Sequence, residues 1–132
     1  IVRQQEQADS ASPTKPPEIS DPGFEGAELE AAQAIVTEAK AQSADVLSQV
    51  RAVVQRMRAS PLDDAAALLL GSKPTELDRL SMATRVLAID RVPVRIVHGI
   101  RLQAEGRKVP IIRWLEVHDR SQWISLDAEG NP

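Results

Sequence analysis

Pro93 marks the point in the chain at which the spacing of apolar side chains changes. Before Pro93 they recur every three or four residues, as on the buried face of a helix. After it, β-branched and apolar residues alternate with polar ones, as in strands that bury one face. Proline disfavours helical backbone at the residue before it, so the last helix should end near Asp90. This order predicts an α+β fold, with helices followed by a small antiparallel sheet.

Start and stop signals bound these elements. Ser43 and Ser60 are the expected N-caps of the second and third helices, and Gly71 ends the third. Thr75 opens the fourth, with Asp78 near its positive end. The expected helices cover residues 27–41, 44–59, 61–70 and 75–90. The expected strands cover residues 94–102, 111–117 and 122–126, with a hairpin connection at 104–108. The expected buried faces are Val46, Val50, Val53 and Met57, and Leu77, Leu80, Thr84 and Leu87.

The first part of the chain differs from the rest in composition. Residues 1–23 are rich in Gln, Ser, Pro and Asp, with few large apolar side chains, which predicts a flexible linker or arm. Residues 24–132 are expected to form one domain. The chain begins with Ile1 rather than methionine, which indicates a piece of a larger protein.

The residue inventory excludes several kinds of chemistry. The chain has no cysteine, which excludes disulfides, thiolate metal sites and a thiol nucleophile. Its two histidines, His98 and His118, lack a ligand spacing, so neither a metal nor a cofactor is predicted. The net charge of −3 gives no reason to expect nucleic-acid binding. Basic residues do gather around the expected hairpin, where Arg101 and Arg113 define a candidate anion-binding edge.

Three stretches resemble the transglutaminase-like core, a papain-like thiol-enzyme fold. They are residues 92–97, reading VPVRIV, 112–117, reading IRWLEV, and 123–127, reading WISLD. In that family a cysteine at a helix start, a histidine on one strand and an aspartate on the next form the catalytic triad. The corresponding positions here are Glu76, Ile112 and Asp127. The resemblance therefore implies a degenerate triad and a domain that is not an enzyme.

A narrower resemblance is to the inactive transglutaminase-like domain of bacterial inner-membrane proteins that carry seven transmembrane helices after it. It rests on residues 42–47 (QSADVL), 97–102 (VHGIRL), the 106–108 turn (GRK), 114–117 (WLEV) and the closing run 123–130. This resemblance implies a periplasmic domain attached to its own transmembrane helices. It also implies a functional link to ATP-grasp ligases of the glutamate-adding kind.

The favoured function is therefore a non-catalytic module that binds a peptide, an envelope component or a partner protein and signals to the membrane helices. Strand alternation places Ile112, Trp114 and Glu116 on one face, as it does Trp123, Ser125 and Asp127. The competing interpretation is that the two Trp side chains pack structurally and that Asp127 is a turn carboxylate. The candidate ligand contacts are Trp114, Glu116, Trp123, Asp127, Arg101 and Arg113.

Two other functions are compatible with the sequence. One is a hydrolase or amide-transfer enzyme with a relocated site, in which Asp127, Glu116 or His98 acts as acid or base; a carboxyl with a raised pKa would suit that role. The other is a structural or homo-oligomerising module that associates through an apolar helix face containing Val53 and Met57.

Overall fold

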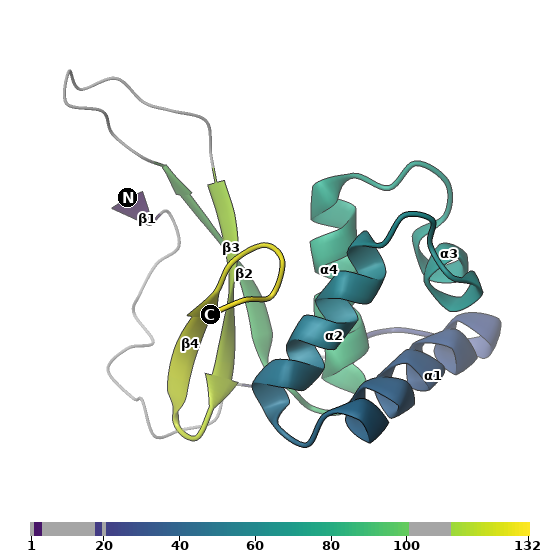
Figure 1. Ribbon diagram of the computed structural model, residues 1–132, viewed down its shortest axis with the longest axis horizontal. Helices are drawn as coiled ribbons and strands as arrows, with labels where there is room; N and C mark the ends of the chain where they lie inside the picture. The colour runs from purple at the N-terminus through teal and green to yellow at the C-terminus, as the bar shows by residue number, and fades with distance from the viewer. Residues whose placement is uncertain (1, 4–17, 20, 101–111) are drawn as a thin grey trace.

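The computed structural model describes residues 2–3, 18–19, 21–100 and 112–132 of the protein. The helices are α1 (Gly26–Gln42), α2 (Val46–Arg58), α3 (Asp64–Leu70) and α4 (Glu76–Ile89). The strands are β1 (Val2–Arg3), β2 (Val94–Ile100), β3 (Ile112–Asp119) and β4 (Gln122–Leu126). The helices form a layer beside the sheet, with α2 and α4 between the sheet and the other two helices (Figure 1). The prediction of an α+β fold with helices before a small antiparallel sheet is confirmed.

Strands β2, β3 and β4 form an antiparallel meander in chain order. A two-residue turn joins β3 to β4, and Arg120 and Ser121 have φ angles of 50° and 70°. Positive φ at both central residues is the conformation of a type I′ hairpin turn, whose twist matches that of the strands it joins. The expected connection at 104–108 and Arg101 lie outside the described residues.

The N-terminal segment makes two contacts that its composition did not predict. Val2 and Arg3 pair antiparallel with Ile100 and Gly99, so β1 extends the sheet beyond β2. The carbonyl oxygen of Pro22 accepts hydrogen bonds of 3.0 and 2.8 Å from Nε and Nη2 of Arg85. These parts of the 1–23 segment are thus joined to the domain, although the segment was expected to be a free arm.

The core lies between the helices and one face of the sheet. Leu115, Val117 and Leu126 fill it from the sheet and are at most 1% exposed. In α2 the predicted face is buried at Val50, Val53 and Met57, while Val46 is half-buried. Val53 and Met57 are therefore part of the domain's own core, which removes them as an association surface.

The expected buried face of α4 was partly wrong. Leu80 and Leu87 are buried as predicted, but Leu77 is 37% exposed and Thr84 is only half-buried. The other buried residues are Ala83 and Val86. Since each helical residue turns the side-chain direction by roughly 100°, Leu77 and Thr84 fall at the margin of this face.

Two of the expected N-caps were also wrong. Asp45 caps α2, where its Oδ2 accepts from the N–H of Ser48 at 2.9 Å, and Asp63 caps α3, where its Oδ1 accepts from Ala66 at 2.9 Å. In both cases a carboxylate closer to the first turn takes the position expected for a serine. Thr75 caps α4 as predicted, in a capping box with Asp78.

Candidate functional site

The face of the sheet that points away from the core carries three of the six predicted contact residues, Trp114, Glu116 and Trp123. Strand pairing sets Glu116 of β3 opposite Arg95 of β2 and Ser125 of β4. Trp114 and Trp123 lie on the same outer face, because they are two residues from Glu116 and Ser125 along their strands. The prediction that these side chains share a face is confirmed.

A buried ion pair occupies the middle of this outer face. Glu116 is 4% exposed, and its Oε1 accepts from Nε and Nη2 of Arg95 at 3.0 and 2.8 Å. The Arg95 guanidinium lies 3.7 Å from the centroid of the Trp123 ring, and His118 meets that ring edge-on at 5.2 Å. Glu116 and Trp123 thus make contacts within the sheet. For Trp123 this agrees with the interpretation that the two Trp side chains pack structurally.

Asp127 follows β4 and is exposed. Its Oδ1 accepts from the backbone N–H groups of Glu129 and Asn131, both at 2.9 Å, and its own N–H donates to the carbonyl of Asn131 at 2.7 Å. The hydrogen bond from Asn131 is the main cause that lowers the pKa of Asp127 below its ordinary value. Asp127 is therefore an ionised turn carboxylate. An acid catalyst would need the opposite pKa shift.

A cavity of about 610 Å³ lies where the end of β4 leaves the edge of β3. Four of the predicted contacts line it: Arg113, Trp114, Glu116 and Asp127. The other lining residues are Ile112, Ser125, Leu126, Asn131 and Pro132. Trp123 lies elsewhere, beside a second cavity that Arg95 also lines. The cavity therefore combines an indole, apolar side chains and charges of both signs.

One edge of β3 is open towards this cavity. Pairing with β4 ends at Leu115 and Leu126, whereas pairing with β2 continues as far as Ile112 and Gly99. Among the residues that the structure describes, residues 112–114 thus have a neighbouring strand on the β2 side only. Sequence analysis missed this edge because it depends on where β4 ends.

Arg113 is the cationic side chain of the cavity. It lies on the core-facing side of β3, opposite His98 of β2. Its Nε is buried and has no hydrogen-bond partner among the described residues. A buried donor without an acceptor is unfavourable, so an acceptor supplied by a ligand would be stabilised there.

Of the three residues that the resemblance assigns to the triad positions, the structure brings two together. Ile112 and Asp127 line the same cavity. Glu76 is exposed in the first turn of α4, 4.0 Å from Arg58, and is not among the lining residues. Within the described part of the chain, no group of three or more His, Cys, Asp or Glu residues is placed to hold a metal ion.

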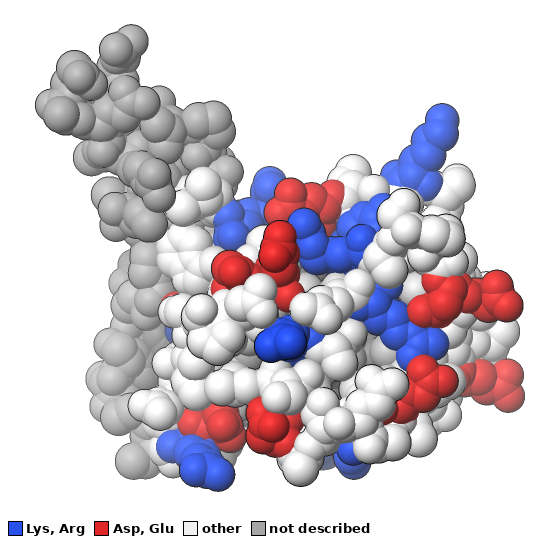
Figure 2. Space-filling view, in the orientation of Figure 1, with Lys and Arg blue, Asp and Glu red and all other residues white. Residues whose placement is uncertain are grey.

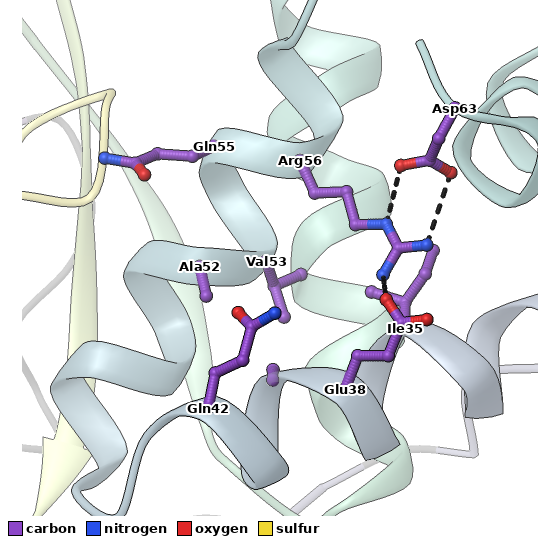
Figure 3. Close-up of a pocket in the computed structure, with 9 residues that line it drawn as sticks. Ile35, Glu38, Gln42, Ala52, Val53, Gln55, Arg56 and Asp63 are labelled. Carbon is purple, nitrogen blue, oxygen red and sulfur yellow. Dashed lines mark hydrogen bonds and ion pairs between the residues drawn. The ribbon is translucent and has the colours of Figure 1, made fainter.

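A third cavity, of about 470 Å³, lies between α1 and α2. Figure 3 shows Arg56 at one end, bound to Glu38 of α1 and to Asp63, the N-cap of α3. The Arg56 Nε–Asp63 Oδ2 distance is 2.7 Å. These ion pairs join three helices, which indicates a structural role. The sequence carried no signal for this group, because its members come from separate elements.

The face of the helical layer that is visible in Figure 2 shows no large area of a single charge. In Figure 2, acidic and basic side chains are interspersed over the visible face of the helices. This arrangement gives no broad electrostatic footprint for a polyanion on that face.

The structure is an α+β domain with its helices beside a small antiparallel sheet and a cavity at the edge of that sheet. The chain belongs to the family described as inactive transglutaminase fused to 7 transmembrane helices, whose model matches residues 1–73. The family is thus one of membrane proteins whose transglutaminase domain is inactive. No curated protein and no solved structure matches the chain. None of the helices among the described residues is long and apolar enough to cross a membrane.

Proposed function

We propose that this chain is a non-catalytic, extracytoplasmic binding domain that recognises a peptide or a partner protein of the cell envelope and relays its binding to the membrane helices. The family supports an inactive domain in a membrane protein. The observation that carries the binding role is the cavity at the open edge of β3, lined by Arg113, Trp114 and Asp127.

The lining of the cavity suits recognition better than catalysis. Trp114 and Ile112 offer apolar surface, while Arg113 and Asp127 place opposite charges at different points of the wall. Such a combination holds and orients a ligand. The chain has no cysteine to act as nucleophile, and the carboxylates at hand are engaged in an ion pair and in a turn. These features favour a ligand that is bound and released unchanged.

The closing turn provides a route from the cavity to the helices. Asn131 and Pro132 form part of the cavity wall, and the neighbouring Gly130 is buried against α2 with a φ of 88°. A Cβ at Gly130 would lie 2.9 Å from the Cα of Arg51. A ligand that displaces the turn would therefore press directly on α2, and this contact is our proposed first step of the relay.

A functional link to ATP-grasp ligases of the glutamate-adding kind would fit this proposal. Such ligases would supply peptides or proteins that carry additional carboxylates. The cavity offers Arg113 as a partner for a carboxylate.

A thermal-shift screen tests the binding role. The purified chain would be heated with short acidic peptides and with peptides of cell-wall type. A ligand that binds only the folded state at 100 times its Kd stabilises it by about 2.7 kcal/mol. We expect the shift to disappear in Trp114→Ala and Arg113→Ala and to persist in Arg58→Ala, which lies outside the cavity. Circular dichroism would establish that each variant is folded. A shift that survives both cavity substitutions would contradict the proposed site.

A further inference from the structure

Resting on that proposed function, we infer the class of ligand: an extended peptide that adds as a strand to the open edge of β3 and places an acidic side chain beside Arg113. Three observations support this inference. They are the direction of the backbone groups in β3, the environment of the Arg113 side chain, and the repulsion between two Arg113 side chains that a second copy of this chain would cause.

The backbone of Arg113 is oriented towards the open edge. The N–H of His118 donates to the carbonyl oxygen of Pro93 at 3.0 Å, on the β2 side of β3. Because backbone groups alternate in direction along a strand, those of residues 116, 114 and 112 also face β2, and those of 117, 115 and 113 face the opposite edge. Leu115 and Val117 have β4 partners there, but Arg113 does not. A strand placed beside Arg113 would continue the ladder where β4 stops.

The side chains around this edge define what such a strand would carry. Residues of an added strand point alternately to the two faces of the sheet. On the outer face they would lie beside Trp114 and Ile112, which suits apolar or β-branched residues. On the other face they would lie beside Arg113, whose buried Nε has no acceptor among the described residues. A carboxylate supplies that acceptor together with the opposite charge.

Asp127 restricts where the acid can lie. Its carboxylate borders the same cavity and is held ionised by backbone N–H groups of its turn. An acidic residue placed against Asp127 would be repelled, whereas one placed against Arg113 would be attracted. The two charges therefore favour one register of the peptide.

A second copy of this chain fits the open edge less well. Two β3 edges paired about a two-fold axis at Arg113 would place the two Arg113 side chains directly across from each other. Like charges in that position destabilise a strand pair. The charge at the edge thus favours an acidic peptide over a homodimer.

The test is a selection from a random octapeptide display library on the 132-residue chain, with counter-selection on the Trp114→Ala/Arg113→Gln double variant. We expect the enriched peptides to contain Asp or Glu. Changing that acid to its amide should weaken the binding of the peptide to the wild-type chain about tenfold. The same change should have little effect on binding to the Arg113→Gln variant. Arg58→Gln serves as the matched control and should retain the preference.

Backbone methylation then tests strand addition. N-methylation at alternate peptide positions should abolish binding, while methylation at the intervening positions should leave it, because only every second N–H faces β3. If N-methylation had the same effect at every position, or if the peptides showed no preference for an acid, this inference would be overturned. Binding of a peptide that depends on Trp114 would in that case still support the proposed function. No enrichment over the counter-selected library would overturn both. A chain that is dimeric without peptide, with a protected Arg113 amide, would assign the edge to a second copy and also overturn the inference.

Discussion

The helical layer and the sheet place their charged side chains differently. In the helical layer, Asp45 and Asp63 cap helices, and Arg56 joins α1, α2 and the start of α3. On the sheet, Arg95 and Glu116 pair with each other, but Arg113 has a buried nitrogen without a partner in the described part of the chain. The charged side chains of the helical layer join helices to one another. Those at the β3 edge, Arg113 and Asp127, line a cavity.

This difference separates scaffold from site. The family match covers residues 1–73, which include α1, α2 and α3. Every residue that lines the cavity at the β3 edge lies between 112 and 132. The family match therefore reaches α1, α2 and α3 but neither α4 nor any residue of the cavity wall. Three sets of substitutions and one titration, in order of expected effect, test this difference between the two regions.

The largest change in the free energy of unfolding should come from Leu115→Ala, compared with the same substitution at its neighbour Trp114 on the opposite face of β3. Leu115→Ala removes a fully buried side chain from the core and should lower the free energy of unfolding by about 2–5 kcal/mol. Trp114→Ala removes a half-buried side chain from the cavity wall and should cost less than half as much. Urea denaturation of both variants measures the two values. Equal losses would mean that the outer face is a second core rather than a binding surface.

Glu116→Gln should have the next largest effect. It removes the negative charge that pairs with the Arg95 side chain, which is 19% exposed, and should cost about 2–3 kcal/mol. The double variant Arg95→Met/Glu116→Leu removes both charges and should recover most of that loss, because replacing a buried ion pair by apolar residues is often neutral. The same denaturation measurement compares them. A double variant no more stable than Glu116→Gln would show that this ion pair is a net source of stability.

Asp63 allows capping and ion pairing to be separated in the helical layer. Asp63→Ala loses both the cap of α3 and the bond from Arg56, and should cost about 1–2 kcal/mol. Asp63→Ser retains a capping oxygen and should recover part of this. The remaining difference, obtained from thermal unfolding, measures the ion pair. If serine recovered the full stability, Arg56 would contribute nothing through Asp63.

Acid titration should give the smallest effect. Burial raises the pKa of Asp63, but the hydrogen bond and charge of Arg56 and the N–H of Ala66 lower it further, so the net shift is downward. A folded-state pKa below the unfolded value of about 3.9 contributes stability that is present above that value and lost as pH falls through the folded pKa. Stability should therefore change little between pH 7 and 5 and decline below about pH 4.

Asp63→Asn provides the control for that titration. Its unfolding free energy should be lower than that of the wild-type chain at pH 7, and the two curves should converge as the pH falls. Parallel curves would show that Asp63 titrates identically in the folded and unfolded states.

The sequence predicted the elements well where side-chain pattern and backbone structure coincide. The four helices, the β3–β4 hairpin and the shared face of Trp114 and Glu116 follow from spacing alone. The caps at Asp45 and Asp63 were missed because serine and aspartate are nearly equivalent capping residues, and only the geometry of the first turn distinguishes them.

The candidate site was predicted as a set of side chains but not as an opening. Periodicity placed Trp114 and Glu116 together, and the structure adds that Glu116 is occupied by Arg95. The open edge at Arg113 depends on β4 ending at Leu126 and on the turn that Asp127 closes. Such features arise from the relative lengths of paired strands, which a single strand's pattern does not contain.

The pairing of β1 with β2 also has a consequence for how the chain is made. Val2 and Arg3 are synthesised before their partners, Ile100 and Gly99, which follow almost a hundred residues later. At ordinary rates of translation this interval is on the order of ten seconds. Throughout it the helices can assemble through contacts close in sequence, while Val2 and Arg3 have no strand to join. Once β2 has been made, its outer edge stays open to other chains until β1 pairs with it.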